Sequence, residues 1–156
     1  MSTENLPAAK AELQNRQIVV VAATYNEKYT TALLQNCLNE LSKLAPGAQV
    51  DVVRVPGAFE VPMMVNHVIQ HRKPHAVIAL GVILRGSTAH ADLIGTAITQ
   101  ELLSAACRTL TPVIHEVLLL NDEQQAEARC IGERLNRGIE SARAAVAMLN
   151  TLAEQN

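Results

Sequence analysis

The sequence predicts an α/β fold in which helices cover both faces of a parallel sheet. Four short apolar runs of the kind found in buried strands alternate with longer segments whose apolar residues recur at helical spacing. The third run, 76–84, contains only aliphatic residues and one glycine, so it must be buried on both faces. At 156 residues, with no repeat or linker, the chain fits one domain with a sizeable core.

Composition narrows the classes of function. A formal net charge of −2 gives no electrostatic reason to expect nucleic acid or an anionic membrane as a partner, and few aromatic side chains are present for base stacking. No apolar run reaches the ~20 residues needed to cross a bilayer. Residues 1–16 are polar and lack the apolar centre of a secretion signal. We therefore expect a cytoplasmic protein with a flexible N-terminal segment over 1–16 and a single domain over 17–156.

Two strand–helix pairs are expected in the first half of the chain. The strands are predicted over 18–23 and 50–55, and the helices over 29–44 and 62–71. Both strands are short and rich in valine, and both helices carry apolar residues three and four positions apart. Pro46-Gly47 ends the first helix, and Pro62 fits the first turn of the second because a first-turn N–H has no partner within the helix.

The second half of the chain repeats this alternation. Strands are predicted over 76–84 and 112–120, and helices over 92–110, from about 123, and from the break at Asn136-Arg137-Gly138 to about 153. Asn121 and Asp122 are candidate caps for the helix that carries Arg129. Because parallel strands end at one edge of a sheet, we expect a ligand site there, formed by Tyr25, Phe59, His90 and the region from His115 to Arg129.

The loop after the third strand, Arg85-Gly86-Ser87-Thr88-Ala89-His90, is the strongest candidate for a ligand site. Gly86 lets the backbone come close to an anion, while Ser87 and Thr88 offer hydroxyl donors. Arg85 adds a positive charge, and His90 can transfer a proton near neutral pH. The alternative is an ordinary strand–helix loop with a capping Ser or Thr.

A second candidate segment runs from Pro56 to Pro62. It contains an exposed Phe59 beside Glu60, which is unusual for a plain loop between two prolines. Glu60 should lie at the N-terminus of the following helix, where free backbone N–H groups gather. The alternative is that Glu60 only interacts with the dipole of that helix.

The three cysteines, Cys37, Cys107 and Cys130, match neither a disulfide framework nor a metal site. They are odd in number and widely spaced. Cys37 and Cys107 lie in apolar helical patterns, so we expect them to be small core residues, with a catalytic thiol as the less favoured alternative.

His67, His71 and His75 are spaced four residues apart, which raises the question of a metal site. However, Pro74 interrupts any helix that would carry all three, and no carboxylate or thiol lies nearby in the sequence. We expect a solvated helix end and no metal site, with metal binding as the less favoured alternative.

The chain resembles the lumazine synthases over nearly its whole length after about Gln17. The resemblance rests on Tyr25-Asn26, 55–62 (VPGAFEVP) and 80–90 (LGVILRGSTAH), and continues through 112–114, 123–129 and 136–138. It implies a flavodoxin-like three-layer sandwich with a central four-stranded parallel sheet, with or without an added N-terminal edge strand. It also implies homopentamers that share active sites between neighbours, sixty-subunit shells in some members, and riboflavin synthase as a further candidate partner.

The resemblance implies an activity and a set of site residues. The family condenses 5-amino-6-(D-ribitylamino)uracil with 3,4-dihydroxy-2-butanone 4-phosphate, releasing phosphate and water without a cofactor, in the penultimate step of riboflavin biosynthesis. By position, His90 resembles the proton-transfer residue. The resemblance implies that the pyrimidine and ribityl pocket is lined by Tyr25, Ala58, Phe59, Glu60, Val82, Ile83, Leu84 and His115. It also implies that the phosphate and butanone site is formed by Arg85, Gly86, Ser87, Thr88 and Arg129.

Four positions depart from the family pattern. Ala91 follows the histidine where Phe or Tyr is usual, and His115 stands where Phe is usual. Leu118-Leu119-Leu120 lacks the usual threonine, and Glu133 replaces a common Lys. These changes leave open a flavin- or lumazine-binding or shell-forming paralogue with weak turnover. An active lumazine synthase is favoured over such a paralogue, because the chain keeps four polar residues of the family site: Glu60, Thr88, His90 and Arg129.

Overall fold

The sheet contains four strands, all parallel, in the order β2-β1-β3-β4. A computed structural model of the chain describes residues 4–9 and 13–156. Its strands are β1 (Gln17–Ala23), β2 (Gln49–Val55), β3 (Ala76–Leu84) and β4 (Val113–Leu120). The predicted four-stranded parallel sheet is confirmed. Within the described residues, no additional N-terminal strand extends its edge.

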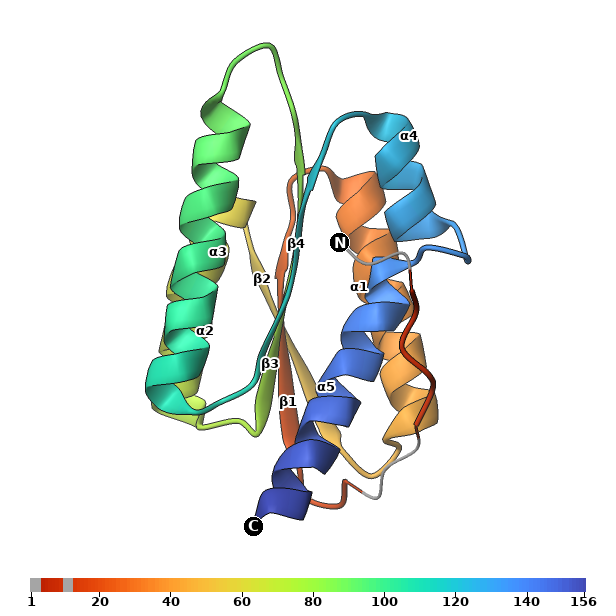
Figure 1. Cartoon of the computed structure of the whole chain (residues 1–156), viewed down its shortest axis with the longest axis vertical. Helices are drawn as coiled ribbons and strands as arrows, with labels where there is room; N and C mark the ends of the chain where they lie inside the picture. The colour runs from red at the N-terminus through yellow and green to blue at the C-terminus, as the bar shows by residue number, and fades with distance from the viewer. Residues whose placement is uncertain (1–3, 10–12) are drawn as a thin grey trace.

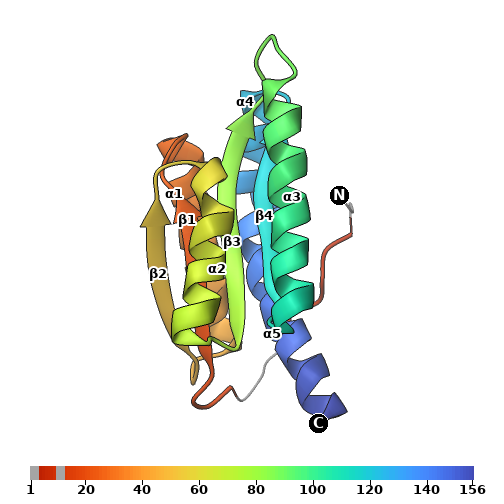
Figure 2. The same cartoon turned by 90° about the vertical axis from the view of Figure 1, so that its left-hand side faces the viewer.

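Helices cover both faces of the sheet, which gives three layers (Figure 1; Figure 2). The helices α1 (Glu27–Leu44) and α5 (Arg137–Gln155) lie on one face, and α2 (Val61–Arg72) and α3 (His90–Thr109) lie on the other. Shorter helical segments are η1 (Ala58–Glu60), α4 (Glu123–Ala126) and the π-helical turn η2 (Glu127–Ile131). In the part of the chain that the structure describes, no helix is both long and apolar enough to cross a membrane.

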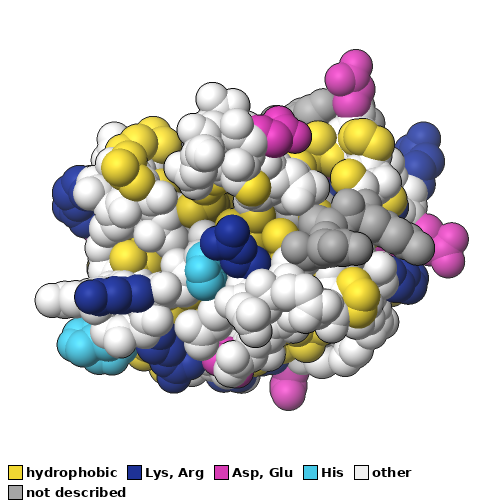
Figure 3. Space-filling model, turned by 90° about the horizontal axis from the view of Figure 1, so that it is seen from below, with side chains coloured by type: hydrophobic (Ala, Val, Ile, Leu, Met, Phe, Trp, Pro, Cys, Tyr) yellow, Lys and Arg dark blue, Asp and Glu magenta, His cyan; other side chains and the backbone are white. Residues whose placement is uncertain are grey.

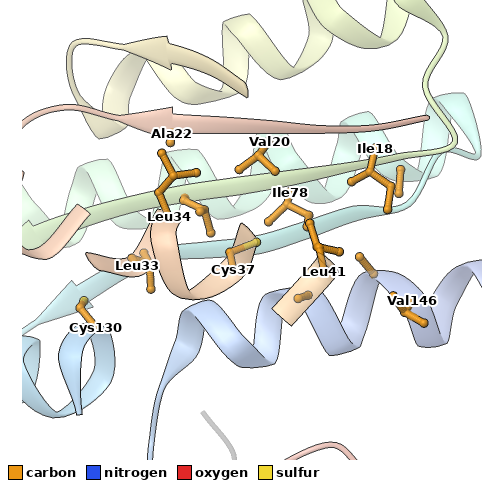
Figure 4. Close-up of a cluster of buried hydrophobic side chains, with 14 of the residues drawn as sticks. Ile18, Val20, Ala22, Leu33, Leu34, Cys37, Leu41, Ile78, Cys130 and Val146 are labelled. Carbon is orange, nitrogen blue, oxygen red and sulfur yellow. The ribbon is translucent and has the colours of Figure 1, made fainter. Parts of the chain in front are cut away.

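Two hydrophobic clusters separate the sheet from its helical layers. Alternate residues of β1 belong to different clusters: Ile18, Val20 and Ala22 to the one under α1 and α5, and Val19, Val21 and Ala23 to the one under α2 and α3. Because side chains alternate along a strand, burial on both faces requires the continuous apolar run seen in the sequence. Figure 4 shows the first cluster.

The three cysteines are free thiols. Cys37 and Cys130 are buried, and burial raises the pKa of each thiol to about 12, so both are protonated at neutral pH. Cys107 is exposed on α3, so its predicted core position is wrong. The buried face of α3 instead carries Ile98, Leu102 and Ala105.

Helix α5 begins at a capped break and lies very close to α1. The side chain of Asn136 accepts a hydrogen bond from the backbone N–H of Ile139 at 3.0 Å, which stabilises the first turn. A Cβ atom at Gly138 would lie 2.3 Å from the carbonyl oxygen of Leu33 in α1. The close contact between these helices therefore requires glycine at this position.

Largely buried ion pairs connect α5 to the sheet and to α1. Arg137 donates two hydrogen bonds to Glu116 of β4, at 2.6 and 3.1 Å. Arg143 donates to Glu40 of α1 at 2.8 Å. Burial raises the pKa of Glu116, and the hydrogen bond from Arg137 opposes that shift. Since Glu116 is buried, removal of Arg137 would leave its carboxylate without its cation, whereas Glu40 would still have Lys43 at 4.0 Å after removal of Arg143.

The N-terminal segment contacts α5 at Leu6. Its backbone N–H donates to both carboxylate oxygens of Glu140, at 3.0 and 3.2 Å, and its carbonyl oxygen accepts from Arg143 at 2.9 Å. Residues 1–3 and 10–12 lie outside the described part of the chain. The flexibility of 1–16 and the domain boundary at 17 stay predictions.

Candidate active site

Loops from the four strand ends meet at the carboxyl edge of the sheet, at the top of Figure 1. The backbone N–H of Tyr25 donates to the carbonyl oxygen of Pro56 at 2.8 Å, which joins the loops after β1 and β2. The backbone N–H of Arg85 donates to the carbonyl oxygen of Leu120 at 2.9 Å, which joins the ends of β3 and β4. The structure therefore gathers the loops at the edge where parallel α/β sheets bind ligands.

Two aromatic side chains are exposed on these loops. Tyr25 is 67% exposed and Phe59 is 66% exposed. The ring of Tyr25 lies against Gly57, where a Cβ atom would come within 3.0 Å of ring atom Cδ2. Glycine at 57 therefore lets the Tyr25 ring lie close to the backbone. Rings held on short, hydrogen-bonded loops can stack on a planar ligand with little loss of conformational entropy.

Asn26 holds the loop after β1 against the end of β3, a role that was not predicted. Its backbone is left-handed, with φ 61°, a conformation that Asn adopts more readily than most residues. Its side-chain Nδ2 donates to the carbonyl oxygen of Val82 at 2.8 Å. This bond brings the loop of Tyr25 to the strand end 82–84, which carries three of the predicted pocket residues. In the sequence, the position of Asn26 directly before a helix was the signal that could have indicated this role.

Glu60 has a partner within its own loop. Its Oε2 accepts a hydrogen bond from the backbone N–H of Gly57 at 2.8 Å. This bond stabilises the start of η1, and both the interaction of Glu60 with the dipole of α2 and its contact with a ligand stay predictions. The neighbouring Ala58 approaches β3 closely, since a Cβ atom at Gly81 would lie 3.6 Å from the Ala58 Cβ.

Arg85 is held by two side chains beside the loop that it begins. Its Nη2 and Nε donate to Oδ1 of Asp92, at 2.6 and 3.2 Å, and its Nη1 donates to Asn121. The hydrogen bond from Arg85 lowers the pKa of Asp92, so this carboxylate is ionised at neutral pH. The guanidinium thus connects the ends of β3 and β4 with the first turn of α3. The role of Asp92 was not predicted, although an acidic residue in the first turn of a helix could have indicated it.

The tip of the same loop is open to solvent. Gly86, Ser87 and Thr88 are exposed, and His90 is exposed as the first residue of α3. A Cβ atom at Gly86 would meet no described atom within 4 Å, and the φ angle of Gly86 is not positive. The protein alone therefore does not require glycine here, whereas an anion bound closely to the backbone would.

Arg129 lies in a different layer from this loop. It is half-buried in η2, which packs against α1 and α5, whereas the loop leads into α3 on the other face of the sheet. Within the described residues, no hydrogen bond or ion pair joins Arg129 to Ser87 or Thr88. The two parts of the predicted phosphate site are therefore not connected within this chain.

His115 does not lie at the carboxyl edge of its own sheet, so its predicted place there is wrong, while its assignment to the pyrimidine and ribityl pocket stays a prediction. It lies near the amino end of the edge strand β4, which begins two residues before it, and it pairs in register with Ala79 of β3. Its Nδ1 accepts from the backbone N–H of Val117 at 3.1 Å, and its Nε2 lies 2.8 Å from Oγ1 of Thr99. Since the Thr99 hydroxyl donates to the Gly95 carbonyl, Nε2 carries the proton and donates to Thr99. Both ring nitrogens are engaged in the neutral ring.

We expect His115 to make the protein less stable in mild acid. Burial lowers its pKa in the folded state, so the unfolded chain takes up the proton first as the pH falls below about 6.5. The unfolding free energy of the native protein should therefore fall between pH 7.5 and pH 5.5 more than that of His115→Gln. Urea unfolding of both proteins at the two pH values measures this difference. An equal change in both would contradict it.

An open parallel sheet with exposed aromatic rings, hydroxyl side chains and an imidazole at its carboxyl edge defines an α/β enzyme with a small-molecule site. Comparison with known proteins identifies the family. The family model of 6,7-dimethyl-8-ribityllumazine synthase matches residues 15–153, and this chain belongs to that family.

Bacterial relatives with the same name cover most of the chain. A 6,7-dimethyl-8-ribityllumazine synthase of Xanthomonas campestris pv. campestris (strain B100) is 36% identical over 87% of this chain and 89% of its own. Those of Xylella fastidiosa (strain M12) and Xanthomonas oryzae pv. oryzae (strain PXO99A) are 35% and 34% identical over the same shares. The family resemblance predicted from the sequence motifs is confirmed.

Proposed function

We propose that this chain condenses 5-amino-6-(D-ribitylamino)uracil with 3,4-dihydroxy-2-butanone 4-phosphate to 6,7-dimethyl-8-ribityllumazine, releasing phosphate and water. The observation that carries the proposal is the exposed His90 at the start of α3, directly after a hydroxyl-rich loop and at the edge that also carries Tyr25 and Phe59. Family membership supports the same reaction. A non-catalytic paralogue is not favoured.

The reaction needs proton transfer and a site that orients two substrates. The amine of the pyrimidine attacks the ketone to form an imine, and loss of phosphate from the neighbouring carbon requires removal of a proton. His90 is our candidate for that proton transfer, because its imidazole is exposed at the start of α3 and imidazole is a side chain that can both accept and donate a proton. We assign the pyrimidine and ribityl pocket to Tyr25, the segment 58–60 and the strand end 82–84. Holding both substrates in one geometry then promotes ring closure.

We assign the phosphate group to the loop 85–88 and to Arg129. The exposed hydroxyls of Ser87 and Thr88 can donate hydrogen bonds, and the open space at Gly86 permits close backbone approach. Arg85 contributes in this proposal mainly by holding the loop, since Asp92 and Asn121 already engage its guanidinium. Arg129 supplies a charge-assisted bond.

We propose that the site is completed by a neighbouring subunit in a homopentamer, with twelve pentamers forming a sixty-subunit shell as the larger alternative. Two observations support an oligomer. Leu93 and Leu103 of α3 are 70% and 64% exposed, as is expected of surface that a partner covers. A hollow of ≈ 500 Å³, lined by Phe59 and Met63 among others, lies between α2 and α3. Particle mass in solution tests both assemblies.

We propose a cytoplasmic location and riboflavin synthase as a candidate partner, since that enzyme class acts on the product. The three free thiols support a reducing compartment. Co-elution of the two proteins at physiological salt tests the partnership, and separate elution would argue against it.

We expect turnover without added metal or nucleotide. Side chains at the carboxyl edge supply the proton transfer and the anion contacts that the reaction needs. Product formation from both substrates, measured by absorbance after dialysis against a chelator, should equal that before dialysis. Activity that is lost to the chelator and restored by a metal ion would contradict this mechanism. Binding of riboflavin-like ligands without turnover would instead favour the paralogue.

Arg129→Ala should raise the KM for the phosphorylated substrate by about 10²-fold, with a smaller change in kcat. The reason is the loss of one charge-assisted contact worth about 2–3 kcal/mol. Steady-state kinetics with the pyrimidine held saturating measures this effect. Arg134→Ala is the matched control, because Arg134 is an exposed arginine close by in the chain. An unchanged KM in Arg129→Ala would rule out the assignment.

Mixed oligomers test whether Arg129 and Tyr25 of different subunits share a site. Subunits of Arg129→Ala and Tyr25→Ala, unfolded together and refolded, should regain activity because some interfaces then combine two native halves. Each variant refolded alone is the control. No recovery in the mixture, with oligomer formation confirmed by mass, would argue for sites built within one subunit.

A further inference from the structure

Two histidines form a stacked pair at the C-terminal end of α2. His67 and His71 are both exposed and lie four residues apart, which places them on one face of the helix. Their ring centroids are 4.1 Å apart and the ring planes make an angle of 27°. This end of α2 lies at the amino edge of the sheet, away from the candidate active site (Figure 1). Figure 3 views the molecule from below and shows imidazole side chains at that surface.

The hydrogen bond of His71 prepares its outer nitrogen for a metal ion. Its Nδ1 lies 2.9 Å from the carbonyl oxygen of His67. Because a carbonyl oxygen can only accept, Nδ1 carries the proton in the neutral ring, and Nε2 keeps its lone pair. Metal-binding histidines typically donate their second ring nitrogen to a backbone carbonyl in this way, which fixes the tautomer and the ring orientation.

We propose that the His67 ring turns out of this stack, so that His67 and His71 together bind one divalent transition-metal ion of the Zn²⁺, Ni²⁺ or Cu²⁺ class. Neutral imidazole is a preferred ligand of these ions, whereas Mg²⁺ and Ca²⁺ prefer oxygen. Two histidines at positions i and i+4 of a helix are a known chelating arrangement, and the partial negative charge at a helix C-terminus favours a cation. The positive charges of Arg72 and Lys73 weaken this attraction.

The proposed site has two protein ligands, and water fills its other coordination positions. Among the described residues, no group of three metal-binding side chains comes together. His75 is not a third ligand, because its Nδ1 accepts a hydrogen bond from the backbone N–H of Gln17 at 3.0 Å and so holds the ring at the start of β1. The proposal is independent of the condensation reaction, which uses the opposite edge of the sheet.

A neighbour-swap variant tests the pair while leaving the composition unchanged. The double substitution His71→Arg with Arg72→His keeps the number of histidines and the charge, but moves the imidazole by about 100° around the helix. Titration of the intact oligomer with Ni²⁺ at pH 7.5, followed by calorimetry, should show one site per chain in the native protein. The swap variant and His67→Ala should each bind about 10²-fold more weakly, because a second tethered ligand raises affinity by that order.

A second measurement separates loss of chelation from misfolding. Zn²⁺ should raise the Tm of the native protein, since it binds the folded helix, and should not raise that of the swap variant. Without metal, both proteins should have the same Tm and the same turnover. Equal Ni²⁺ affinity in the native and swap proteins would overturn the proposal, and so would a native protein that shows no saturable site. A swap variant with a lowered metal-free Tm would be replaced by His67→Gln, with the same expected loss of affinity.

Discussion

Replacing His90 with alanine should lower kcat by about 10²- to 10⁴-fold, the usual contribution of general acid–base catalysis. Some turnover should remain, because an amine and a ketone form an imine slowly without catalysis and the pocket still orients them. The KM values should change little. His90 is exposed at the start of α3, so its removal leaves no cavity in the core.

His115→Ala is the control for this prediction, because it removes the other imidazole that was considered for proton transfer. Both nitrogens of His115 are already engaged, by Val117 and Thr99, near the amino end of β4. The pH–rate profile of His90→Ala should therefore lose its limb near neutrality, and that of His115→Ala should keep it. The reverse result would show that His115 is the proton-transfer residue.

Gly138→Ala should destabilise the protein by about 3 kcal/mol, although alanine is the better helix former by about 1 kcal/mol. A methyl group at this position would lie 2.3 Å from the carbonyl oxygen of Leu33, so α5 and α1 would have to separate. That separation would disturb the cluster shown in Figure 4, to which both helices contribute. Urea unfolding at one fixed subunit concentration measures the loss.

Gly86→Ala is the matched control for the effect on stability. A Cβ atom at Gly86 meets no described atom within 4 Å, so the unfolding free energy should change by less than about 0.5 kcal/mol. If Gly138→Ala were as stable as the native protein, the close approach of α1 and α5 would not be essential to the fold. A large loss in Gly86→Ala would show that the loop needs glycine even without a ligand.

The strands could be predicted from the sequence because burial on both faces leaves a continuous signal. In β3 the run from Ala76 to Leu84 contains no polar side chain, and its first seven residues are buried. Helix ends were also predictable where one residue type decides them. Asn136 caps α5 and Asp122 caps α4 by local hydrogen bonds, which need no distant partner.

The candidate site was predictable only in part. The loops of Tyr25, Phe59 and His90 meet at one edge because parallel strands end together, which is a consequence of topology. The predicted strand 112–120 already put His115 near its amino end, so the expectation that His115 lies at the carboxyl edge did not fit that strand. Only the register with β3 shows that His115 lies beside Ala79. Asn26 was missed because its partner, Val82, lies 56 residues further along the chain. Asp92 was missed because its bond to Arg85 depends on how the loop between β3 and α3 folds back.

The sequence by itself determined the fold class, the order of the elements and the family, because apolar periodicity, local caps and continuous motifs are all written along the chain. The tertiary structure alone decided that Asp92 and Asn121 engage Arg85, and that Arg129 lies in another layer from the loop 85–88. These are properties of distance and direction between segments. They are set by strand register and helix packing, which no single stretch of sequence specifies.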